Sequence, residues 1–91
     1  MFVNDENGVE LVNAGFPSLE GRNLMDLRDA EGKRPVRNYI ELALRDGEGW
    51  TTYLWPEPDR SPLPLRKHTF VKKVVLSSGE TLIVGAGLYE P

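Results

Sequence analysis

The stretch from Gly47 to Tyr89 constrains the fold most strongly, because it holds three strand-like runs separated by loop signals. Side chains alternate between two faces along Trp50–Trp55, and a second run, Arg66–Leu76, follows a proline-rich segment. A Ser-Ser-Gly-Glu turn then leads to Thr81–Tyr89, which is almost continuously apolar. These runs predict one antiparallel sheet in which residues 81–89 form a central strand covered on both faces.

Glycine and proline add detail to this predicted sheet. Gly85 and Gly87 fall inside the last run, where glycine marks a bend or a place where another group approaches the backbone closely. Four prolines lie between the first two runs and predict a stiff, irregular excursion there, at positions 56, 58, 62 and 64.

One helix is expected over residues 35–46. Apolar side chains recur there at the helical spacing i, i+3, i+4, i+7 and i+8, as Val36, Tyr39, Ile40, Ala43 and Leu44. Pro35 suits the first helical position, and Gly47 suits the residue that follows the last turn. A helix this short is not stable alone in water, so its apolar stripe must pack on the sheet.

Two shorter strands are expected before the helix. Phe2-Val3 opens the first strand, and Asn7-Gly8 is a strong hairpin signal. Three side chains alternate along the returning strand, namely Val9, Leu11 and Asn13.

A short helical turn over about residues 23–28 can be capped by Asn23. The chain is therefore expected to be an α+β domain of PAS-like type. It would contain a five-stranded antiparallel sheet, one main helix over about 35–46 and the short helical turn.

Composition excludes several functional classes. With 91 residues the chain makes one domain at most, and without cysteine it has no disulfide, thiolate metal ligand or cysteine nucleophile. The lone histidine, His68, is a poor metal site by itself. The serines fall in turns rather than at the strand-to-helix elbow of a hydrolase. We therefore expect no enzyme activity, no metal and no cofactor.

Charge and hydropathy limit the partners and the location. Basic side chains outnumber acidic ones in residues 60–91, which suits an anionic partner, whereas the net charge of −3 counts against nucleic acid. No apolar run is long enough to span a membrane. Asp5, Glu6 and Glu10 exclude a secretory signal peptide. The chain is expected to be cytoplasmic if it is complete, and periplasmic if it is a fragment of a receptor.

The order of these elements and several short stretches resemble the single Cache domain of bacterial chemoreceptors and sensor histidine kinases, in its second type. The matching stretches follow the family order and cover most of the chain: Phe2-Val3 with Asn7-Gly8, Gly21–Asp29 with Gly32-Lys33, Gly47–Trp50 with Tyr53–Pro56, Lys67–Lys72, and Val84–Tyr89.

The resemblance implies that residues 1–91 form one Cache-like sensor domain that lacks the usual long N-terminal helix. Such a domain senses a small organic molecule outside the cytoplasm for signal transduction. The ligand, often a short carboxylate, lies between the sheet and the helical layer. Many relatives carry a histidine in the second strand, where this chain has Asn13-Ala14, so that residue's role does not carry over.

Five residues are candidates for the ligand site. The family motif places a lysine at Lys67, whose ammonium could meet a ligand carboxylate, and Thr69 follows on the same strand face. Tyr53 and Trp55 share a face and could supply a hydroxyl and an apolar wall, although aromatic side chains also fill small cores. Met25 could line the pocket from the helical side, with core packing as its alternative.

Two other functions are compatible with this sequence. The first is a ligand-free protein-interaction or dimerisation module of the same fold, in which an exposed sheet face would support a homodimer. The second, nucleic-acid binding, is the least supported and would use Arg60, Arg66, Lys67, Lys72 and Lys73.

Overall fold

The protein is described here by a computed structural model of residues 1–58 and 61–90. Its core element is a five-stranded antiparallel sheet with the strand order β2-β1-β5-β4-β3. The elements along the chain are β1 (Phe2–Asp5), β2 (Glu10–Asn13), the 3-10 helix η1 (Pro17–Leu19), α1 (Pro35–Asp46), β3 (Glu48–Glu57), β4 (Ser61–Val75) and β5 (Thr81–Tyr89). The predicted α+β fold with one five-stranded antiparallel sheet and one main helix is confirmed.

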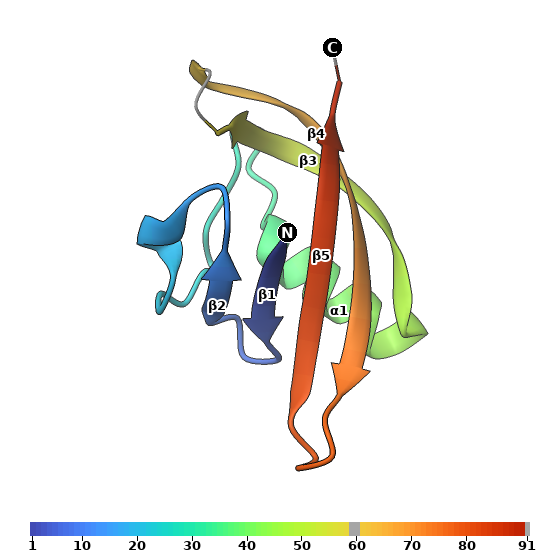
Figure 1. Ribbon diagram of the computed structural model, residues 1–91. Coiled ribbons are helices and arrows are strands. Elements are labelled where there is room, and N and C mark those ends of the chain that lie inside the picture. Colours follow the sequence, from blue (N-terminus) through green and yellow to red (C-terminus); the bar gives the residue numbers. More distant parts are fainter. Residues whose placement is uncertain (59–60, 91) are drawn as a thin grey trace.

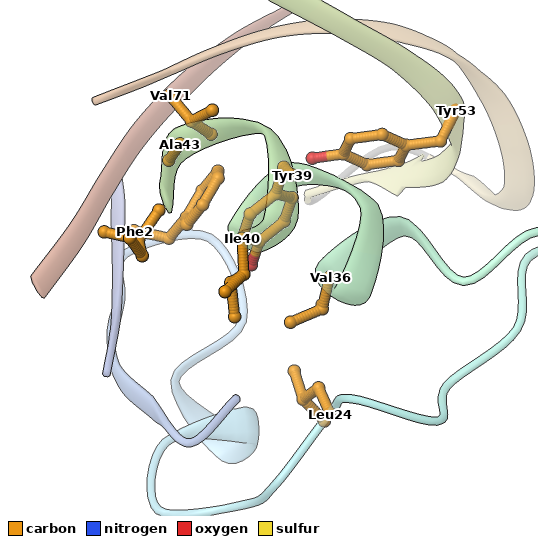
Figure 2. Close-up of a cluster of buried hydrophobic side chains, with 9 residues drawn as sticks. Phe2, Leu24, Val36, Tyr39, Ile40, Ala43, Tyr53 and Val71 are labelled. Carbon is orange, nitrogen blue, oxygen red and sulfur yellow. The ribbon is translucent and has the colours of Figure 1, made fainter. Parts of the chain in front are cut away.

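Helix α1 lies across one face of the sheet, as Figure 1 shows. It has the predicted bounds, begins at Pro35, and ends before Gly47, whose φ of 84° is the left-handed conformation expected after a last helical turn. The apolar stripe is buried except for Leu44, which is 41% exposed at its rim. In Figure 2, Val36, Tyr39 and Ile40 lie between Phe2 of β1 and Leu24 of the preceding loop. The core is therefore a single helix packed on one sheet.

Strand β5 is central, as predicted, but only one of its faces is covered. Ile83 points into the core and is fully buried, whereas Leu88 on the opposite face is 70% exposed. The prediction of two covered faces is wrong for this strand, because the only α-helix of the described residues lies on the other side. A continuous apolar run therefore does not require two layers here.

The proline-rich segment is more regular than predicted. Pro56 of β3 pairs with Pro64 of β4, so the two strands extend into the expected excursion. Proline is tolerated at sheet edges, and β3 is an edge strand, while β4 pairs with β5 only from Lys67 onward. Residues 59–60 of the expected excursion lie outside the described residues.

The N-terminal hairpin is confirmed, but its second strand faces differently from the prediction. The pairings Val3 with Val12 and Asn4 with Glu10 leave Leu11 as an extra residue, which is a β-bulge. As a result Glu10 and Asn13 are buried, and Leu11 is 41% exposed. The predicted alternation of Val9, Leu11 and Asn13 is therefore wrong.

The segment 23–28 contains hydrogen-bonded turns and no helix. Asn23 caps no helix, and its Oδ1 instead accepts the backbone N–H of Met25 at 3.0 Å and closes a side-chain turn. One further bond, from the N–H of Leu27 to the carbonyl of Leu24, closes a single turn. The short helical element lies instead at η1, in a stretch where a loop was expected.

Candidate functional site

The side chain of Lys67 points from β4 into the space between the sheet and the N-terminal segment. Its Nζ lies 5.5 Å from the centre of the Phe2 ring and 5.4 Å from that of Tyr89, which are distances of cation–π contact. Tyr89 stands directly opposite Lys67 on β5, and Tyr53 stands opposite it on β3. The ammonium is thus held among aromatic rings rather than extended into bulk water.

Gly87 allows the lysine to lie across β5. A Cβ at this position would lie 2.3 Å from Lys67 Cε and 2.8 Å from Thr69 Oγ1, both far shorter than real contacts of this kind. Gly85 plays the same part for Phe2, whose ring would lie 2.1 Å from an added Cβ. The predicted close approach of another group to these glycines is confirmed.

A cavity of about 190 Å³ opens beside the Lys67 side chain. The polar groups at its wall include the ammonium of Lys67 and the amide of Asn13, and Gly15 and Gly87 contribute backbone. The remainder of its lining is mainly apolar or aromatic and consists of Met1, Phe2, Phe16, Trp55, Pro58 and Tyr89. The cavity wall therefore combines a cation, an amide and backbone groups with apolar and aromatic side chains.

Burial lowers the pKa of Lys67, and the opposite charge of Glu10 partly offsets this shift. Within residues 1–58 and 61–90, no carboxylate oxygen comes within the 4.0 Å limit of a direct ion pair with its Nζ. The lysine is therefore a partly desolvated cation at the cavity wall.

Glu10 and Asn13 form a buried polar group that sequence reasoning missed. Asn13 Nδ2 donates to Glu10 Oε2 at 2.7 Å, and Asn13 Oδ1 accepts the backbone N–H of Phe16 at 2.8 Å. The Glu10 side chain is almost fully buried, and its Oε1 accepts no hydrogen bond from the described residues. Burial raises the pKa of Glu10, against the lowering effects of the Asn13 and Asn4 amides and, after them, of the Lys67 charge.

Glu10 and Lys67 share a second, much smaller void of about 10 Å³. Tyr39 and Tyr53 also line it, and it shares Phe2, Asn13, Trp55 and Lys67 with the larger cavity. Its volume is at the lower limit for a single water molecule. The two ionisable groups therefore line one small space together.

The predicted site residues occupy three different places. Lys67 and Trp55 line the larger cavity. Tyr53 and Thr69 lie beneath it, fully or nearly fully buried, with Thr69 Oγ1 donating to the Tyr53 hydroxyl at 2.9 Å. Met25 lines neither void and packs beside Gly8, which leaves no room for a Cβ there.

His68 faces away from the cavity, as strand alternation predicts. Its Nδ1 lies 3.0 Å from Thr52 Oγ1, and its Nε2 lies 2.7 Å from a carboxylate oxygen of Glu90.

Among the described residues, no group of three or more histidine, cysteine, aspartate or glutamate side chains is arranged for a metal ion. None of their helices has the length and apolar character needed to cross a membrane.

Comparison with known families decides the classification. The family model dCache_2, described as "Cache domain", matches residues 1–90, which is nearly the whole chain. The chain belongs to the Cache domain family. The predicted resemblance to Cache sensor domains of chemoreceptors is thereby confirmed.

The relatives of this Cache domain are chemotaxis receptors. The methyl-accepting chemotaxis protein McpP of Pseudomonas putida (strain KT2440) is 26% identical over 88 residues, which are 97% of this chain and 15% of that protein. The chain therefore matches a small part of this much longer relative.

Solved structures of chemotaxis sensor domains are among those that share the fold. A structure described as a periplasmic sensor domain of a chemotaxis protein has a TM-score of 0.86 at 30% identity, over 99% of this chain and 60% of that chain. A Cache chemosensory domain described in terms of carboxylic acid recognition has a TM-score of 0.84 at 28% identity, over 99% and 58%. A methyl-accepting chemotaxis protein from Vibrio parahaemolyticus RIMD 2210633 has a TM-score of 0.79 at 28% identity, over 97% and 56%.

Proposed function

We propose that this Cache domain binds a short organic carboxylate in the cavity at Lys67, as the sensing part of an extracytoplasmic receptor. The main support is the Lys67 ammonium, which lines the cavity without a directly paired carboxylate among the described residues. A bound carboxylate would provide the missing negative charge. Because the site is partly desolvated, this attraction would be stronger than on an open surface.

The shape of the cavity favours a ligand of a few heavy atoms. Its volume of about 190 Å³ is below the range of about 300–1,000 Å³ for sites that hold drug-sized molecules. The rings of Phe16, Trp55 and Tyr89 would contact a short alkyl chain while the carboxylate meets Lys67. The Tyr89 hydroxyl already donates to the Pro56 carbonyl at 2.7 Å, so we expect this ring to act as a wall.

The comparisons support this proposal at two levels. The family and its chemotaxis relatives support a sensing role, and one structural neighbour is described by carboxylic acid recognition.

Nucleic-acid binding is disfavoured by the positions of its expected residues. Lys67 points inward, Arg66 pairs with Glu31 at 3.0 Å, and Arg60 lies outside the described residues.

A melting screen tests the proposal. Acetate, propionate, lactate and pyruvate should raise Tm, whereas propylamine and propionamide, which lack the negative charge, should not. A ligand at 100 times its Kd adds about 2.7 kcal/mol of stability, which amounts to several degrees in a small domain. If no carboxylate raises Tm at millimolar concentration, the proposal is wrong.

A pair of lysine variants assigns the effect to the cavity. Lys67→Met keeps an apolar stem but removes the charge, so we expect it to abolish the carboxylate shift. Lys72→Met changes an exposed lysine of the same strand and should leave the shift unchanged. Equal loss of the shift in both variants would point to nonspecific anion binding instead.

The alternative of a ligand-free interaction or dimerisation module rests on the uncovered sheet face. Trp50 is 63% exposed there and packs against the Phe70 ring, with 5.3 Å between ring centres. An obligate dimer in light scattering, combined with no ligand in the melting screen, would favour this alternative over sensing.

A further inference from the structure

Glu10 is a buried acid close to the cavity. Binding of a carboxylate at Lys67 does not by itself explain why an acid is buried there. It is only 2% exposed, and one carboxylate oxygen has no hydrogen-bond partner among the described residues. The β-bulge at Leu11 turns it inward, onto the face that carries Lys67. Burying an acid in this way costs free energy unless the charge is compensated or the group is protonated.

While the cavity holds no anion, the side-chain amides of Asn13 and Asn4 favour the ionised form of Glu10, and Lys67 adds the one positive charge among these compensating groups. Glu10 and Lys67 line the same small void, and each charge favours the charged form of the other group. The Lys67 charge lowers the pKa of Glu10, and the Glu10 charge raises the pKa of Lys67. At a pH above the raised pKa of Glu10, the pair is then neutral overall. A ligand carboxylate at Lys67 would add a second negative charge around one ammonium, and a nearby like charge disfavours the ionised form of a carboxyl group.

We propose that Glu10 takes up a proton from solvent when an anionic ligand enters the cavity, so that carboxylate binding is coupled to protonation. This inference rests on the proposed function. The charges balance: Lys67 with ionised Glu10 sums to zero before binding, and Lys67, protonated Glu10 and the ligand anion sum to zero afterwards. The site would therefore bind the ligand together with a proton.

The other charged or titratable groups that face Glu10 do not take up the proton in its place. Glu20, which follows η1, accepts the backbone N–H of Asn13 at 2.9 Å and also disfavours a charge on Glu10. Tyr39 of α1 and Tyr53 of β3 line the small void, and burial raises the pKa of both above the usual tyrosine value. Both tyrosines are thus neutral wherever Glu10 titrates.

Carboxyl NMR tests the coupling directly in the unmodified protein. The ¹³C signal of the Glu10 carboxyl is followed from about pH 4 to 9, without ligand and saturated with propionate. We expect the midpoint of its titration to move to higher pH on saturation. The Kd of propionate should rise with pH, by up to about tenfold per unit, between the two midpoints.

The indole N–H signal of Trp55 shows whether propionate binds in the cavity, and it therefore distinguishes a failure of the proton coupling from a failure of the proposed function. A saturable change at Trp55 with an unchanged Glu10 titration would overturn the coupling and leave the proposed function standing. No change at Trp55, or at any other cavity residue, would instead overturn the proposed function.

A second arm needs no ligand. Lys67→Met removes the compensating charge, so the Glu10 midpoint should move to higher pH in this variant but not in Lys72→Met. An unchanged Glu10 midpoint in Lys67→Met would show that the two groups do not interact, and it would overturn the inference whether or not propionate binds.

Discussion

Lys67 and Glu10 line the same small void, where burial favours the neutral form of each group. Burial raises the pKa of Glu10 and lowers the pKa of Lys67. For Glu10 this shift is upward, so the folded protein retains a proton that the unfolded chain has already released. Stability then falls as the pH rises above the ordinary value of 4.5 and through the folded pKa. Below 4.5 both states are protonated, and the group has no effect.

Glu10→Gln should remove this contribution. The Gln side chain has nearly the same shape and can still offer its carbonyl to Asn13, which donates to Glu10 in the wild type. We expect wild-type stability, measured relative to the variant by urea unfolding, to fall with rising pH above 4.5 and then to level off. Glu6→Gln, at an exposed position, is the control. A constant difference across the pH series would show that Glu10 is not perturbed.

At this scale, regular alternation decides what the sequence can predict. The inward position of Lys67 follows from alternation along β4, whose pairing from Val75 to Lys67 has no register shift. Glu10 could not be predicted in the same way, because the bulge at Leu11 reverses the faces of β2. A buried glutamate next to an asparagine is also contrary to the usual preference for charged residues on the surface.

Strand β5 is the element that shapes the site, through two glycines with different neighbours. An added Cβ at Gly85 would meet the ring of Phe2, a core residue that is 6% exposed. At Gly87 the contact is mainly with the flexible stem of Lys67. A glycine-to-alanine substitution should therefore affect mainly core packing at Gly85 and mainly the position of the Lys67 side chain at Gly87.

Gly85→Ala should lower the free energy of unfolding by about 1–3 kcal/mol, which is the usual range for overpacking a core. Gly87→Ala should cost less stability, because the lysine stem can move, but it should weaken propionate binding by displacing the ammonium. Urea unfolding and calorimetric titration measure the two effects. If Gly87→Ala binds propionate as tightly as the wild type, the position of Lys67 across β5 is not needed for binding.

The elements themselves were predictable where local signals agree. Helix α1 has its predicted bounds because Pro35, the apolar stripe and Gly47 all indicate the same segment. The prolines at 56 and 64 misled the prediction of an irregular excursion, since proline is also compatible with an edge strand. Sequence signals alone do not say which strand will lie at the edge.

At the scale of the whole molecule, one chain supplies both the cation and the aromatic side chains that the proposed site uses. We propose that these groups suffice for binding. We expect the Kd of propionate to be the same at low and high protein concentration, with one site per chain by calorimetric titration. A Kd that improves in step with dimer formation, followed by light scattering, would show that a second copy completes the site.

The family and the general fold could be predicted from the sequence, whereas the shape of the cavity could not. Stretches such as Lys67–Lys72 and Val84–Tyr89 support the family. The cavity, however, depends on how the segment around Phe16 meets Trp55 and Pro58, residues that are distant in sequence and carry no local signal of contact. Met25 packs beside Gly8 and lines neither the cavity nor the small void, and this position depends on the turn at Asn23.

A crystal structure of the protein grown with propionate tests the role of Lys67 most directly. We expect density for the ligand in the cavity, with a carboxylate oxygen about 2.7–3.2 Å from Lys67 Nζ and the alkyl chain against Trp55. If propionate is bound elsewhere while this cavity is empty or filled only by water, then Lys67 is not the group that recognises the carboxylate.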